Sequence, residues 1–140
     1  MKYENADNCL PSEAIIIHRV QESEDIFSLY VKLTDSKRHQ YFAEAMPGQF
    51  VKVYCYGVGE VPISIADGKM EEYSCQLTIR AHGTVTRQLN SLKIGDSVGL
   101  RGPFGRGWPL YECYHKNIII ITGGIGSAPT IGAIKHITKN

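Results

Sequence analysis

Two stretches of this sequence combine residue types that suit phosphate binding, and the first is HGTVT at residues 82–86. A glycine and threonines at a helix start leave backbone N–H groups without partners inside the helix, and the positive end of the helix dipole favours an anion there. Arg80 lies just upstream and could add a bidentate cation. An ordinary helix cap by Gly83 or Thr84, without any ligand, is the alternative.

The second stretch is GGIGSAP at residues 123–129, directly after the apolar run NIIIIT at 117–122. It is similar to a dinucleotide-binding loop but lacks the G-x-G-x-x-G spacing. A strand leading into such a loop is the context that a nucleotide site requires, and the apolar run supplies it. A tight turn without a ligand is the alternative interpretation.

Two further stretches have residues that could contact a flat aromatic ring. In VPIS, residues 61–64, the Ser64 hydroxyl could bond a ring nitrogen and Ile63 could pack against the ring, although a solvent-facing serine has no need of a ligand. In RGPFGRGWP, residues 101–109, glycines allow close approach of the backbone. There Phe104 and Trp108 could close over an aromatic cofactor or seal a barrel end without one.

The sequence offers no arrangement typical of a metal site or a covalent nucleophile. No histidine has a Cys, Asp or Glu at metal-ligand spacing, and there is no nucleophile elbow. The cysteines are well separated and form no C-x-x-C pair: Cys9, Cys55, Cys75 and Cys113. This spacing argues against zinc and iron–sulfur ligation and favours unreactive thiols in a reduced, cytoplasmic compartment.

The composition narrows the class of partner. The formal net charge of +1 over 140 residues gives no electrostatic case for nucleic acid or an acidic membrane surface. The apolar runs are too short to cross a bilayer, and the first residues show no secretory signal. We therefore expect neither a nucleic acid nor a membrane partner.

The hydrophobic pattern predicts a mainly β protein. The expected strands lie at residues 12–23, 25–33, 49–57, 60–66, 74–82 and 97–102. Residues 84–92 have helical spacing, and residues 34–49 look like a polar loop. Pro62 cannot donate to a sheet, so it belongs at an edge, a bulge or a strand start. Six short strands and frequent turns indicate a small closed barrel.

The pattern changes after Trp108. Residues 117–122 predict a strand covered on both faces, and residues 130–139 predict a helix after the glycine loop. Strand, glycine loop and helix are the opening of an α/β nucleotide-binding domain. We therefore divide the chain into a barrel domain, 1–110, and the start of a second domain, 111–140.

In this order, four phrases resemble the ferredoxin–NADP reductase superfamily: PGQFVKV, GVGEVPISIA, LTIRAHGTVTRQLNSLKIGDSVGLRGPFGRGWP and IIIITGGIGSAPT. The likeness is greatest to the flavin subunits of three multi-subunit enzymes. These are the gamma subunit of sulfhydrogenase, the flavin-carrying subunit of anaerobic sulfite reductase and the electron-transfer subunit of dihydroorotate dehydrogenase. The phrases cover most of residues 47–130.

The resemblance implies a six-stranded antiparallel Greek-key barrel that holds FAD, with FMN less favoured, followed by an α/β domain for NAD(P)H. Electrons would pass from the nicotinamide through the flavin to an iron–sulfur or other redox subunit, with no catalytic side chain. The implied cofactor-binding residues fall in four groups. They are Pro62, Ile63 and Ser64 at the isoalloxazine; Thr78, Ile79 and Arg80 near the ribityl chain or phosphates; Gly83, Val85 and Thr86 at the pyrophosphate; and Gly123, Gly124 and Gly126 at the nicotinamide.

Two departures from the family pattern qualify these expectations. Val61 stands where the family usually has an arginine, which removes a phosphate-binding cation. The chain also ends where the nicotinamide domain should continue, so we expect a truncated chain with an incomplete NAD(P)H site that does not complete hydride transfer alone. Residues 117–140 would then pair with a second copy, swap between protomers or pack on their own barrel. A cofactor-free barrel that serves as an assembly or interaction module is the alternative function.

Overall fold

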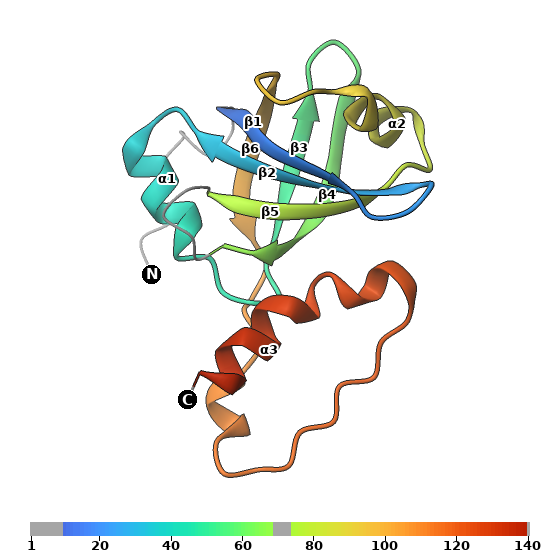
Figure 1. Cartoon of the computed structure of the whole chain (residues 1–140). Helices are drawn as coiled ribbons and strands as arrows, with labels where there is room; N and C mark the ends of the chain where they lie inside the picture. Colours follow the sequence, from blue (N-terminus) through green and yellow to red (C-terminus); the bar gives the residue numbers. More distant parts are fainter. Residues whose placement is uncertain (1–9, 69–73, 140) are drawn as a thin grey trace.

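The computed structural model describes residues 10–68 and 74–139 and contains a closed antiparallel barrel with strand order β1-β2-β5-β4-β3-β6 (Figure 1). The strands are β1 (Ser12–Gln21), β2 (Ile26–Leu33), β3 (Phe50–Cys55), β4 (Gly59–Asp67), β5 (Cys75–Arg80) and β6 (Ser97–Phe104). Each of the six predicted strands corresponds to one of these, so the predicted barrel is confirmed. Part of the segment between the fourth and fifth predicted strands, residues 67–73, lies outside the described residues.

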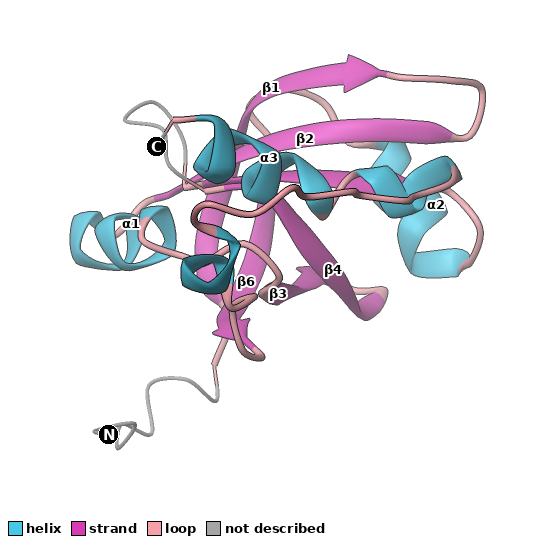
Figure 2. Cartoon of the chain, turned by 90° about the horizontal axis from the view of Figure 1, so that it is seen from below, coloured by secondary structure: helices cyan, strands magenta, loops and turns pink. Residues whose placement is uncertain are grey.

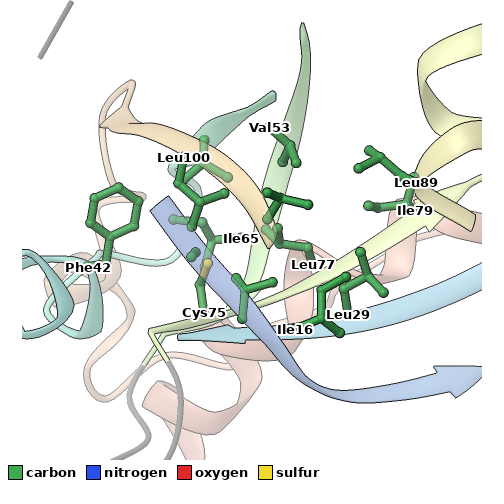
Figure 3. Close-up of a cluster of buried hydrophobic side chains, with 14 of the residues drawn as sticks. Ile16, Leu29, Phe42, Val53, Ile65, Cys75, Leu77, Ile79, Leu89 and Leu100 are labelled. Atoms are coloured by element: carbon green, nitrogen blue, oxygen red, sulfur yellow. The ribbon is translucent and has the colours of Figure 1, made fainter. Parts of the chain in front are cut away.

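Alternation along each strand separates the barrel interior from its outer face. In β3, Val51, Val53 and Cys55 are buried, whereas the residues between them are partly exposed. Side chains from all six strands meet inside, including Ile16, Leu29 and Leu100 (Figure 3). Burying these apolar groups is the main favourable contribution to folding.

Helix α1 (Ser36–Ala43) lies in the segment that the sequence predicts to be a polar loop, so that prediction is wrong. Asp35 caps the helix by accepting a hydrogen bond from Lys37 N at 2.9 Å, and Phe42 is fully buried against the barrel. A single deeply buried aromatic in a strongly polar stretch gives too little periodicity to indicate a helix.

Strand β4 separates from β5 over most of its length. The two strands pair only at Ile65↔Leu77 and Asp67↔Gln76, with an irregularity between these pairs, while β4 pairs with β3 from Gly59 onward. Ile65 N donates to Gln49 O in the segment that leads into β3. Because the direction of backbone N–H and C=O groups alternates along a strand, those of the odd-numbered β4 residues point toward β3 and those of the even-numbered residues point away from it. Pro62 therefore faces the open edge, which confirms its predicted edge position.

Helix α2 (Thr84–Ser91) covers the end of the barrel beside this opening, as Figure 1 shows. Leu89 is fully buried, and Val85 and Leu92 pack against the core with partial exposure. These are the i, i+4 and i+7 positions that predicted the helix. A Cβ placed on Gly59 would lie 3.1 Å from Val85 Cγ2, so the helix approaches β4 closely.

The glycine- and proline-rich segment after β6 packs against the turn that precedes β3. Trp108 N donates to Pro47 O at 2.8 Å, and a Cβ on Gly48 would lie 2.7 Å from the indole. Gly48 has φ +96°, a conformation that favours glycine. Trp108 therefore packs on the backbone of Gly48, in the turn that precedes β3.

The segment that follows differs from the prediction at one point. Residues 117–122 form no strand, and Ile119 and Ile121 are 85% and 92% exposed, so the expectation of a strand covered on both faces is wrong for this structure. No described residue pairs with this segment, and a strand forms only against a neighbour.

The predicted helix at 130–139 is confirmed as α3 (Thr130–Thr138), which packs under the barrel near β4 (Figure 2). Ala133 is buried in this contact, and Lys135 Nζ forms an ion pair with Asp67 Oδ2. Packing on its own barrel, one of the expected outcomes, thus holds for α3. Short 3₁₀ segments η2 (Leu110–Cys113) and η3 (Gly124–Ser127) lie between β6 and α3.

Candidate functional site

The start of α2 is held by one threonine hydroxyl. Thr86 Oγ1 accepts hydrogen bonds from His82 N at 3.0 Å and from Gly83 N at 2.9 Å, and it donates to Gly83 O at 3.1 Å. Gly83 is the N-cap and has extended backbone. The amide of Gly83 and the hydroxyl of Thr86 are thus already used within the loop, and both belong to residues predicted at the pyrophosphate.

The next backbone amides are the open ones. Those of Thr84, Val85 and Thr86 have no acceptor among the described residues. They are consecutive, point out of the first turn of the helix and carry the positive end of its dipole. The phosphate-binding capacity that the sequence indicates therefore begins one residue later than Gly83.

The other end of α2 is attached to β1. Arg19 Nη2 donates to Asn90 O at 2.9 Å and to Asn90 Oδ1 at 2.6 Å, and the guanidinium lies 5.5 Å from the Phe27 ring centroid. A cation at the last turn also complements the negative end of the helix dipole. This contact joins residues far apart in the sequence and fixes where the helix points.

An apolar ledge lies beside the open amides. We use this name for Val61, Ile63, Ala81 and Val85, which pack against the core but keep part of their surface exposed. The first two lie on β4 at the separation from β5, and the others flank the start of α2. The ledge provides a partly exposed apolar surface next to an anion-attracting helix start.

The outer face of β4 carries the remaining residues of the VPIS motif. Pro62 and Ser64 are exposed, and Ser64 pairs with Phe50 in β3. Phe50 also pairs with Phe104, and their ring centroids are 5.7 Å apart. Phe104 therefore packs on a neighbouring ring near Ser64.

The three predicted residues of β5 have different environments. Ile79 is 1% exposed in the core, so a ligand could meet only its backbone. Thr78 Oγ1 lies 2.8 Å from the hydroxyl of buried Ser28, which also donates to Glu22. Arg80 is exposed, and its Nε donates to Asp25 Oδ2 at 2.7 Å.

Position 61 has no cation, and the nearby charges on the outer face are paired. Arg101 bonds both carboxylate oxygens of Glu60, and Lys52 lies 3.8 Å from the same group. Hydrogen bonding from Arg101, with the charges of Arg101 and Lys52, lowers the pKa of Glu60. Arg87, in the first turns of α2, is exposed and has no ion pair among the described residues.

The sequence predicts the helix at 84–92 but does not single out Arg87, because an exposed arginine in the first turns of a helix needs no ligand. Long side chains in a helix lean back toward its N-terminal turn. Arg87 is thus an exposed cation on the first turns of the helix that presents the open amides.

The glycine loop is brought against the barrel. Its 3₁₀ segment η3 contacts β5, and Gly124 has φ +54°. A Cβ placed at position 123 or 124 would meet nothing within 4 Å, and at Gly126 only Thr122 Oγ1 comes near, at 3.4 Å. The three predicted glycines therefore form an open surface, and β5 links this loop with α2.

In the described part of the chain, no cluster of His, Cys, Asp or Glu could hold a metal ion, and Cys55 and Cys75 are buried. Burial raises the pKa of the Cys75 thiol to about 12 and also raises that of Cys55, so both remain protonated at neutral pH. Cys9 lies outside the described residues. No described helix has the length and apolar character needed to span a bilayer.

Known proteins resemble the chain in sequence and in fold. The gamma subunit of sulfhydrogenase 1 from Pyrococcus furiosus is 46% identical over 94 residues, which is 67% of this chain and 32% of that protein. A probable dihydroorotate dehydrogenase B electron transfer subunit from Methanocella arvoryzae is 45% identical over 59% of this chain and 29% of its own length. No family model matches.

Among solved structures, ferredoxin-NADP+ reductase from Plasmodium falciparum superposes with a TM-score of 0.74 over 99% of this chain, at 19% identity and over 54% of that chain. The chain belongs to the ferredoxin–NADP reductase superfamily. It spans about a third of the length of these two curated relatives. This superfamily barrel explains why the strands, α2 and the glycine loop occur in this order.

Removing the Thr86 hydroxyl should loosen the helix start. Thr86→Val leaves the amides of His82 and Gly83 without their acceptor, and we expect the free energy of unfolding to fall by about 1–2 kcal/mol. Thr84→Val is the matched control, because the Thr84 hydroxyl makes no hydrogen bond with a described residue. Urea denaturation measures both; equal losses would contradict the role assigned to Thr86.

Proposed function

We propose that the barrel binds FAD at the opening formed by β4, β5 and the start of α2, as the flavin module of an NAD(P)H-dependent electron-transfer oxidoreductase. The observation that supports this most is the run of open amides at Thr84, Val85 and Thr86 beside the apolar ledge. A flavin nucleotide has an anionic diphosphate and a flat, largely apolar ring system, and the two surfaces suit these two parts. When bound, a flavin accepts a hydride and passes electrons on singly.

The residues of the chain would bind and orient the cofactor. The open amides and Arg87 would hold phosphate oxygens, which compensates for the apolar residue at position 61. Ile63 would contact the ring from the ledge, and Pro62 and Ser64 would border it on the outer edge of β4. Three consecutive amides can bind the oxygens of a single phosphate or of a diphosphate, so the preference for FAD over FMN rests on the family resemblance.

The glycine loop and the partner are parts of the same proposal. Gly123, Gly124 and Gly126 would begin an NAD(P)H site, because the space around them is open. The relatives are named as subunits, which supports an iron–sulfur or other redox subunit as partner. Cys55, Cys75 and Cys113 form no disulfide, which supports a reducing, cytoplasmic location.

A cofactor-free barrel that acts as an assembly module is the second candidate. Val61 in the usual cation position and the occupied amide of Gly83 favour it. The two candidates differ in whether purified protein takes up flavin.

Flavin titration separates the candidates. Following flavin fluorescence, we expect FAD to bind most tightly, FMN more weakly and riboflavin least, because the phosphates meet the open amides. Arg87→Gln should weaken FAD binding roughly tenfold and affect riboflavin little. Arg106→Gln, an exposed arginine after β6, is the control. Protein that binds none of the three flavins would refute the flavin proposal and favour the assembly module.

We also infer that the exposed isoleucines at 118–121 mediate contact with a second copy when nothing else covers them. Changing Ile119 and Ile121 to Lys should shift the protein toward monomer in light scattering and change the free energy of unfolding by less than about 0.5 kcal/mol. The control changes Ile94 and Tyr111, exposed apolar residues elsewhere, to Lys. Self-association that persists in the first variant would contradict this inference.

A further inference from the structure

A groove of about 440 Å³ lies between α3 and the barrel, at the carboxyl end of β4. It is on the side of the barrel where α3 packs, whereas α2 lies at the other end (Figure 1). It also lies along the C-terminal half of α3, away from the glycine loop that precedes the helix. The groove is therefore separate from both the proposed flavin site and the start of the nucleotide site.

One wall of the groove is apolar. Met46 and Pro47 precede β3, and Ile65 lies at the end of β4 where it still pairs with β5. Gly132 of α3 forms the base of the contact: a Cβ there would lie 3.2 Å from Ala66 O and 3.5 Å from Pro47. The close approach at Gly132 places this wall directly beside α3, and the groove lies next to this contact.

The facing wall carries two lysines. Lys135, His136 and Lys139 line it from the last turn of α3 and the residue after it, and Asp67 is the one acidic residue among the described lining residues. The Asp67 carboxylate is 8% exposed and paired with Lys135. Lys139 makes no ion pair with a described residue. The groove thus presents the charge of Lys139, which is unpaired among the described residues, opposite an apolar surface.

We propose that this groove binds a small organic acid, with its apolar body against Met46, Pro47 and Ile65 and its anionic group at Lys139. The volume lies in the range of pockets that hold small molecules, roughly 300–1,000 Å³. Asp67 repels an anion from the deep end and keeps Lys135 engaged, so the acidic group takes the outer position. The inference does not depend on flavin binding.

The test compares 1-naphthoate with its neutral analogue 1-naphthamide on the full chain. Titration followed by ¹⁵N–¹H NMR should show tighter binding of the acid, with the largest amide shifts in α3 and at Met46. Lys139→Gln should weaken naphthoate binding roughly threefold to tenfold and leave naphthamide unchanged. Lys93→Gln, an exposed lysine after α2, is the matched control and should change neither affinity.

A second variant tests the apolar wall. Met46 is 53% exposed, so Met46→Gln should preserve the fold while weakening the acid and the amide alike. Equal affinity for naphthoate and naphthamide, equal effects of the two lysine variants, or shifts confined to residues 117–122 would each overturn the proposal.

Discussion

The architecture depends on the early separation of β4 from β5. β4 and β5 pair only at Ile65↔Leu77 and Asp67↔Gln76, near the end of β4 and the start of β5. From Gly59 to Ser64, β4 pairs with β3 alone. Pro62 removes a donor from the open edge, so this edge could not form a complete ladder. A barrel that is closed in order but open along one seam leaves room for helix α2 to pack against β3 and β4.

Helix α2 fills part of this seam and is fixed at both ends. The Thr86 hydroxyl satisfies the amides before the helix, and Arg19 holds its last turn against β1. Its buried face, centred on Leu89, closes the core. The consequence is that the next three amides are left pointing outward in a defined direction, beside an apolar surface that the open strands leave exposed. Rigid presentation of these groups favours binding because little order has to be gained when the ligand arrives.

Much of this could be predicted from the sequence, because alternation in strands such as 50–55 and the helical spacing of Val85, Leu89 and Leu92 are local patterns. The start of α2 is also predictable, but which amides are free depends on a hydroxyl that folds back on its own loop. Helix α1 cannot be predicted in this way, because one buried residue, Phe42, gives no periodicity. The sequence shows that residues 117–122 are apolar. Whether they form a strand depends on a neighbouring strand to pair with, which the local pattern does not reveal. The groove under α3 joins residues from distant segments and has no sequence pattern.

We propose that the amides of Thr84, Val85 and Thr86 meet the diphosphate of FAD, and ¹⁵N–¹H NMR of the labelled chain during addition of FAD is the sharpest test. These three amides should shift most among the residues before and within α2, while the amides of His82 and Gly83, bonded to Thr86, should shift less. Unchanged resonances at Thr84–Thr86 in a chain that has taken up FAD would contradict it.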